Sequence, residues 1–182
     1  TQLADALGEQ RNEVERYIAA SQELVTPKLS AWLTEFGMEA VSEVGGKAAA
    51  LGEIKRRLGL PVPEGYVLTT AAYRQFCGIP LWEAIRDAIQ GVDVDDLEAL
   101  QAISTRLAEM VMAQPVPRAV EVAISERALT LKTGEVGLAV RSSAVGEGGQ
   151  KTFAGQYLSL INVAKDQVVD AYKQVIAGRF SA

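Results

Sequence analysis

Apolar residues recur at helical spacing along most of the chain, and short runs of β-branched and aromatic residues interrupt them. Positions 1–37 carry two apolar sets at intervals of three and four residues, which predict two helices with Pro27 opening the second. A further helix is predicted over 48–58, where Gly59 ends it as a C-terminal cap. We expect positions 1–37 to form a helical linker or the end of a preceding domain, and positions 38–182 to form the main domain.

The rest of the chain mixes short strands with helices. Strands are predicted where β-branched and aromatic residues gather, at 66–70, 137–140 and about 152–163. Helices are predicted at 71–76, in three segments between 81 and 131, and at 166–176. Thr70 is a suitable N-cap for the first of these, and Asp95 and Asp96 can open the middle one of the three segments. The expected fold class is a helix-rich α/β (α+β) arrangement.

The first candidate site lies where Gly45, Gly46 and Lys47 precede the helix predicted over 48–58. The first turn of a helix offers backbone N–H groups and partial positive charge to an anion, and two glycines allow close approach of a ligand. A lysine at this place opposes the helix dipole, which a bound phosphate would explain. The alternative is a flexible turn followed by a solvated lysine, since the segment lacks the Ser or Thr of a P-loop.

The second candidate site follows the strand predicted over 137–140, which leads into Arg141, Ser142 and Ser143. Arginine can hold a phosphate through two parallel hydrogen bonds, and the serine hydroxyls add neutral donors. A glycine-rich connection over 146–149 then leads to the next strand, so that its N–H groups could fold over a polyphosphate. The alternative is an ordinary hairpin with an exposed arginine, although a long glycine-rich connection is a poor hairpin turn.

Composition excludes several classes of protein. The 182 residues are 48% hydrophobic with a net charge of −5, which fits a globular chain and argues against a protein that binds nucleic acid. One cysteine and no histidine exclude a disulfide framework, a histidine-ligated metal, a catalytic serine–histidine pair and a phosphohistidine within this chain. No apolar run is long enough to span a membrane and no secretory signal is present, so we expect a cytoplasmic protein that binds no membrane.

Other chemistry-bearing residues have simpler interpretations. Asp93, Asp95 and Asp96 lack the spacing of a calcium loop and are better explained by a helix start, so no metal site is predicted. Cys77 lies among apolar residues and is expected to be a core or near-surface thiol. Trp32 and Trp82 are expected to be packing residues.

Five segments together resemble the N-terminal nucleotide-binding domain of the pyruvate, phosphate dikinase and phosphoenolpyruvate synthase family, often labelled PEP/pyruvate-binding. The segments are VGGKAAALGE at 44–53, PVPEGYVLTTAAY at 61–73, VRSSA at 140–144, TFAGQY at 152–157 and LINV at 160–163. Their order and spacing agree with the family over roughly 37–182. Rifampicin phosphotransferases look similar in this region, so the subfamily stays open.

The resemblance implies the first lobe of an ATP-grasp-like domain that binds ATP as its cofactor. Lys47 and Arg141 would contact the ATP phosphates, and other residues would complete the site: Gly45, Gly46, Ser142, Ser143, Gly148, Gly149, Gly155 and Gln156. A phosphoryl group would pass to a histidine on a separate domain of the parent chain, and a third domain would exchange it with pyruvate or phosphoenolpyruvate. No catalytic residue is expected within this chain.

Two departures from the family pattern affect these expectations. The segment GEGGQK at 146–151 replaces the acidic, proline-containing stretch that family members usually carry, which changes the charge of the loop. The second lobe, with its magnesium-binding carboxylates, is expected after position 182, so this chain alone is expected to be inactive. The alternatives are a non-catalytic nucleotide-sensing module and a protein-interaction domain that uses the N-terminal helices.

Overall fold

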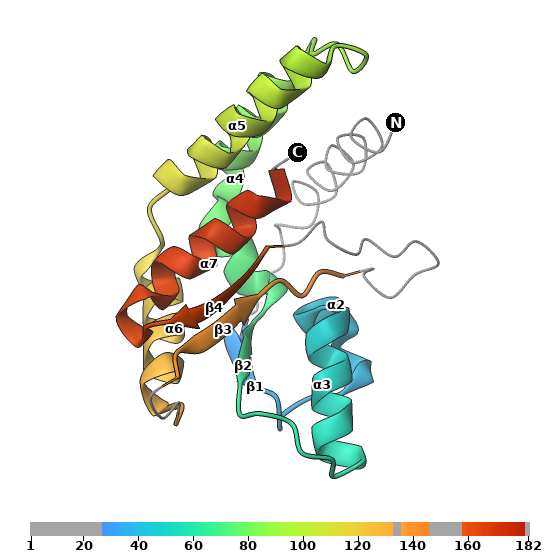
Figure 1. Ribbon diagram of the computed structural model, residues 1–182, viewed down its shortest axis with the longest axis vertical. Helices are drawn as coiled ribbons and strands as arrows, with labels where there is room; N and C mark the ends of the chain where they lie inside the picture. The colour runs from blue at the N-terminus through green and yellow to red at the C-terminus, as the bar shows by residue number, and fades with distance from the viewer. Residues whose placement is uncertain (1–26, 133–135, 146–157, 181–182) are drawn as a thin grey trace.

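The computed structural model of the chain describes residues 27–132, 136–145 and 158–180 (Figure 1). Helices account for most of these residues, and the strands are short. The elements follow in the order β1 (Ser30–Trp32), η1 (Met38–Ala40), α2 (Val41–Val44), α3 (Gly46–Arg57), β2 (Tyr66–Leu68), α4 (Thr70–Ile89), α5 (Leu97–Ala113), α6 (Arg118–Thr130), β3 (Leu138–Arg141), β4 (Ser159–Val163), η2 (Lys165–Gln167), α7 (Val168–Ala177) and η3 (Gly178–Phe180).

The described strands form two small antiparallel sheets. Strand β1 pairs with β2, with Trp32 opposite Tyr66, and β3 pairs with β4, with Arg141 opposite Ser159. Side chains of β3 alternate between partly buried and exposed, so Arg141 lies on the exposed face. The helix-rich composition is confirmed, and the described part is α+β because its strands pair antiparallel rather than through parallel crossovers.

Buried apolar side chains join the helices to the sheets. The first cluster lies between α4, α5 and α7 and includes Phe76, Leu107 and Ile176. In a second cluster, Ile124 of α6 packs with residues of α7 and β4 against one face of the β3–β4 sheet. A third cluster packs α3 against β1 and α2, with Ala49 fully buried. Figure 1 shows the consequence: α4 and α5 extend to one end of the molecule, α3 lies at the other, and the β3–β4 sheet lies between them.

The prediction of a helix through the second apolar set of positions 1–37 is wrong at residues 30–32, which form strand β1. The spacing of Trp32, Leu33 and Phe36 suits a helix, but pairing with β2 outweighs this local preference. Trp32 lies edge-on against Tyr66, with the ring centroids 5.8 Å apart, and the Arg127 guanidinium lies 4.5 Å from the centre of the Trp32 ring. The division of the chain at position 37 stays a prediction.

Most helix boundaries agree with the predicted ones. Gly59 follows α3 with a φ of 61°, as expected for a C-terminal cap, and α4 is kinked at Gly78, between the two helices predicted there. The N-cap of α4 is Thr69 and not Thr70, because Thr69 has an extended backbone and its hydroxyl accepts a hydrogen bond from the Ala72 N–H. None of the helices within the described ranges is long and apolar enough to cross a membrane.

Candidate functional site

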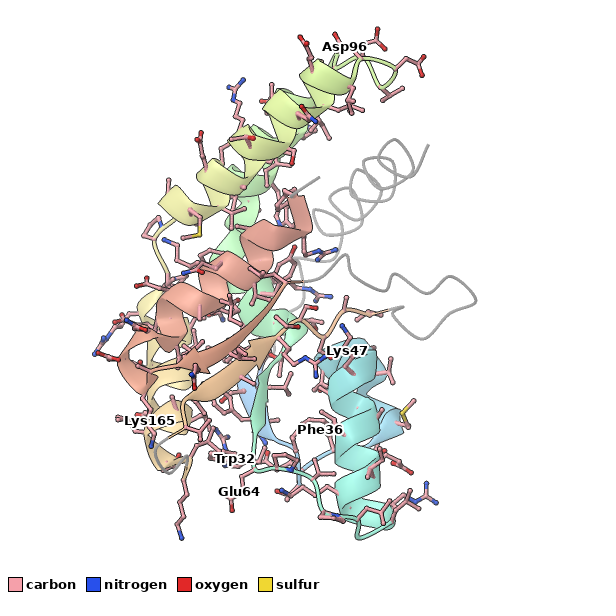
Figure 2. The ribbon with its side chains drawn as sticks, in the orientation of Figure 1. Trp32, Phe36, Lys47, Glu64, Asp96 and Lys165 are labelled. Carbon is pink, nitrogen blue, oxygen red and sulfur yellow. The ribbon has the colours of Figure 1, made fainter. Side chains whose placement is uncertain are left out.

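The first candidate segment forms a sharp turn between two helices. Helix α2 ends at Val44, Gly45 has φ 78° and ψ 165°, and α3 begins at Gly46. This combination of dihedral angles is accessible almost only to glycine. The Gly45 N–H donates to the Val41 carbonyl at 2.9 Å, which closes α2 before the chain turns into α3. This turn places the exposed Lys47 in the first turn of α3, which contains no acidic residue (Figure 2).

The second candidate segment leaves strand β3 at Arg141. Because side chains alternate along the strand, Leu138 and Val140 face the core while Arg141 faces solvent. The Arg141 Nε–H donates a long hydrogen bond of 3.4 Å to the Ser159 hydroxyl on the paired strand. Ser159 was not predicted as a site residue, because only the β3–β4 register places it beside the arginine.

The structure brings the two candidate segments into direct contact. The Ser143 hydroxyl donates to the Val44 carbonyl at 2.8 Å and accepts from the Ala48 N–H at 2.9 Å, across 95 residues of sequence between Ala48 and Ser143. The Gly46 N–H donates to the Ala144 carbonyl at 3.0 Å. Ser143 therefore caps the N-terminus of α3, although it belongs to another part of the chain. We call the contact between residues 44–48 and 141–144 the junction.

Gly45 allows this close contact. A Cβ atom at Gly45 would lie 1.9 Å from the Ser143 carbonyl oxygen and 2.6 Å from its hydroxyl oxygen. Any larger residue would push the two segments apart, because backbone atoms cannot give way as a side-chain end can. The glycine predicted to let a ligand approach thus lets the 141–144 segment approach.

The junction joins segments that each carry a cation. Ala144 contacts the start of α3, which carries Lys47, and an extended chain from Ala144 back to Arg141 spans at most about 10 Å. The positive end of the α3 dipole adds to the two cations. The N–H groups of Gly45 and Gly46 were predicted to donate to phosphate, but both donate to backbone carbonyls within the protein. A phosphate would therefore be bound mainly by the side chains of Lys47 and Arg141.

Of the other predicted site residues, the structure describes Ser142 but not the glycine-rich segment. Ser142 is part of the junction segment 141–144, and its side chain is partly buried. Four of the predicted residues lie outside the described residues: Gly148, Gly149, Gly155 and Gln156.

The helix start predicted at Asp96 and the packing roles predicted for Cys77, Trp82 and Trp32 are confirmed. Asp96 caps α5 by accepting hydrogen bonds from the N–H groups of Glu98 and Ala99, as a helix start requires. In the described ranges, no group of three or more acidic, cysteine or histidine side chains could hold a metal ion. Cys77 and Trp82 are buried in the cluster between α4, α5 and α7, and Trp32 packs on Tyr66.

Comparison with known proteins gives a consistent picture. A family model described as pyruvate phosphate dikinase, AMP/ATP-binding domain, matches residues 41–182, a range that includes both sides of the junction. A probable phosphoenolpyruvate synthase of Methanocaldococcus jannaschii is 37% identical over 153 residues, which are 81% of this chain and 13% of that protein.

Two further relatives cover a similar part of the chain. A phosphoenolpyruvate synthase of Aquifex aeolicus is 36% identical over 160 residues, which are 82% of this chain and 19% of that protein. A rifampicin phosphotransferase from a Streptomyces species is 37% identical over 133 residues, which are 72% of this chain and 15% of that protein. The chain therefore spans less than a fifth of the length of each of these three relatives.

Proposed function

The chain belongs to the family of the pyruvate phosphate dikinase AMP/ATP-binding domain, and on this premise we propose that it holds the phosphates of ATP in a phosphotransferase of the dikinase or phosphoenolpyruvate synthase type. The observation that carries the proposal is the junction, in which hydrogen bonds join the Lys47 segment to the Arg141 segment. Both cations are exposed, and both lie on segments that are anchored to the fold.

The chemistry of the two side chains suits a triphosphate. Arg141 presents a planar guanidinium that can bind two phosphate oxygens at once, while Lys47 supplies a compact charge at the start of a helix. Phosphoryl transfer depends on positioned positive charge more than on covalent chemistry by the protein. In this proposal Gly45, Gly46 and Ser142 shape the site, and the glycine-containing segment with Gly148, Gly149, Gly155 and Gln156 covers the phosphates.

The remaining steps are assigned to other parts of a longer protein. The chain is the first lobe of an ATP-grasp-like domain, and a second lobe supplies the carboxylates that bind magnesium. A histidine on another domain receives the phosphoryl group, and a further domain exchanges it with pyruvate or phosphoenolpyruvate. The small share of each relative that the chain spans supports this division, and the chain alone is then inactive.

Enzyme activity of the full-length protein tests the proposal. We expect ATP consumption that depends on pyruvate and is accompanied by formation of phosphoenolpyruvate. Arg141→Ala should reduce kcat/KM by roughly 10- to 100-fold, because a charge-assisted hydrogen bond contributes about 1.5–3 kcal/mol. Arg118→Ala is the matched control, since Arg118 is exposed on α6 and pairs with Glu121 in a surface ion pair.

Two outcomes would contradict the proposal. If the full-length protein neither binds nor consumes ATP, the chain is an interaction domain with a vestigial site. If it binds ATP but transfers no phosphoryl group to any acceptor, the chain is a nucleotide-sensing module.

A second candidate function has a specific observation in its favour, the similarity to a rifampicin phosphotransferase over 72% of the chain. In this alternative the ATP site is the same, but the final acceptor is a rifamycin-type small molecule instead of pyruvate. Supplying pyruvate and rifampicin in parallel assays distinguishes the two, because only one of them should accelerate ATP consumption.

A further inference from the structure

The Ser143 hydroxyl has two protein partners at short distance. It donates to the Val44 carbonyl at 2.8 Å and accepts from the Ala48 N–H at 2.9 Å. A hydroxyl group has one hydrogen to donate, and here the Val44 carbonyl receives it. Ser143 therefore has no second hydrogen for a phosphate oxygen, whereas its neighbour Arg141 carries a charged fork of donors on the exposed face of β3.

We propose that Ser143 is a positioning residue, which fixes Arg141 and Lys47 relative to each other and acts on ATP only through them. This inference rests on the proposed function, since it assumes that both cations bind the same triphosphate. It assigns Ser143 a role distinct from that of a ligand-contacting serine.

The geometry gives the mechanism. The Ala48 N–H is in the first turn of α3, one residue after Lys47, so a bond to Ala48 fixes the backbone that carries the lysine. Ser143 is two residues after Arg141, so the same bond fixes the end of the strand that carries the arginine. The Gly46–Ala144 hydrogen bond adds a second link beside Ser143, and the lack of a Cβ at Gly45 leaves room for the Ser143 backbone.

The energetic consequence is preorganisation. With the two cations held in place, ATP binding does not have to order the 141–144 segment, and each cation can contribute its full interaction. Without the Ser143 bonds, part of the interaction energy of Arg141 is spent on ordering this segment. The contribution of Arg141 to ATP affinity should therefore depend on the presence of the Ser143 hydroxyl.

The test measures ATP dissociation constants for the full-length protein by calorimetry. We expect Ser143→Ala to raise the dissociation constant roughly 5- to 30-fold, the effect of losing one or two net hydrogen bonds. Arg141→Ala should raise it strongly in the wild type, but at least about threefold less in the Ser143→Ala background, as for coupled neighbours. Ser143→Thr keeps the hydroxyl and should restore most of the affinity.

Hydrogen–deuterium exchange of the peptide around Ala48 reports on the contact directly. Without ATP, the Ala48 amide should be protected in the wild type and in Ser143→Thr, and should exchange faster in Ser143→Ala. If Ser143→Ala does not fold, Ser143→Cys replaces it, because the thiol has a similar shape but is a weak hydrogen-bonding group.

Ser104→Ala is the matched control for general loss of stability. The Ser104 hydroxyl also donates across the fold to a backbone carbonyl, that of Phe180, but Ser104 lies on α5, outside the junction. We expect this variant to lower the melting temperature without changing the ATP dissociation constant.

The proposal is overturned if Ser143→Ala binds ATP as the wild type does, if its effect and that of Arg141→Ala are simply additive, or if ATP exposes the Ala48 amide by drawing Ser143 away. Failure of the proposed function has a different signature. In that case the wild type does not bind ATP, or Arg141→Ala leaves its affinity unchanged, while the protection of Ala48 is still lost in Ser143→Ala.

Discussion

At the scale of single residues, Gly45 combines two requirements that only glycine meets. Its φ of 78° and ψ of 165° lie in a region that side chains rarely enter, and its missing Cβ leaves room for the Ser143 backbone. The glycine predicted from the sequence as part of a phosphate site thus also joins two distant segments. The first requirement is local, whereas the second depends on the tertiary contact.

Two glycine substitutions separate the requirements. Gly91 has a similar φ of 74°, but a Cβ there would meet no atom within 4 Å. We expect Gly91→Ala to lower the free energy of unfolding by about 1–2 kcal/mol, the usual cost of positive φ for alanine. Gly45→Ala should cost about 3 kcal/mol or more, because a backbone clash is added. Chemical denaturation measures both, and equal losses would show that the clash is relieved without cost.

Ionisation of Tyr66 is expected to lower the free energy of unfolding at alkaline pH. Burial raises the pKa of its hydroxyl to about 12, and the positive charge of Arg127 offsets part of this increase. The hydroxyl donates to the Ile124 carbonyl at 3.0 Å, which requires the protonated form. Since the unfolded state ionises near pH 10, the stabilisation is fully present below that pH and is lost as the pH rises towards 12, by up to about 2–3 kcal/mol.

Tyr66→Phe isolates this contribution. Between pH 10 and 12, the unfolding free energy of the wild type should fall more steeply than that of the variant, as measured by denaturant titration at each pH. Parallel curves for the two proteins would contradict the assignment.

The residue scale also shows what the sequence could and could not predict about the site. The positions of Lys47 at a helix start and of Arg141 at a strand end could be predicted, while their role in binding ATP stays a proposal. The role of Ser143 does not follow, because its hydrogen-bond partners are 95 and 99 residues away and no local pattern encodes them.

At the scale of elements, the helices were predicted well and strand β1 was not. Helices α5 and α6 carry apolar positions at a regular period over 17 and 13 residues, so the signal accumulates along each of them. Strand β1 has three residues, and its partner β2 begins more than thirty positions later. A period of three to four residues and a period of two cannot be distinguished over so short a segment.

Contacts of β1 with α6 stabilise the strand. Arg127 lies over the Trp32 ring and donates hydrogen bonds to the Ser30 hydroxyl and carbonyl oxygens, at 3.2 and 3.5 Å. Glu35 is 3.6 Å from the same guanidinium. Arg127 belongs to α6 and lies almost a hundred residues after Ser30, which explains why local propensity did not reveal the strand.

The start of α4 offers a test at this scale. The Thr69 hydroxyl donates to the Lys28 carbonyl at 2.7 Å and accepts from the Ala72 N–H, while the Thr70 hydroxyl makes a single long bond of 3.4 Å to the Ser42 carbonyl. Thr69→Ala should therefore lower the unfolding free energy by about 1–2 kcal/mol, and Thr70→Ala by less than about 0.5 kcal/mol. Thermal denaturation of both variants measures the difference, and the reverse order would show that Thr70 is the cap.

At the scale of the whole molecule, the fold brings together the segments that carry Lys47 and Arg141. Helix α3 packs on β1 and α2, whereas β3 packs on α6 and α7, so the exposed Lys47 and Arg141 are carried by elements that pack in different hydrophobic clusters. The hydrogen bonds of Ser143 and Ala144 join these parts. The sequence predicted two separate candidate sites, and the tertiary structure brings the two segments into contact.

The family membership agrees with this combination, since the matched range of 41–182 contains both segments. The chain spans 13% and 19% of the lengths of two phosphoenolpyruvate synthases that it resembles. In the proposed function, Lys47 and Arg141 bind the same ATP molecule.

Calorimetric titration of ATP into the full-length protein tests this claim most directly, with the wild type compared to Lys47→Ala, Arg141→Ala and the control Arg118→Ala. We expect the first two variants each to raise the dissociation constant roughly 10-fold or more, and the control to bind ATP as the wild type does. Unchanged ATP affinity in either Lys47→Ala or Arg141→Ala would contradict it.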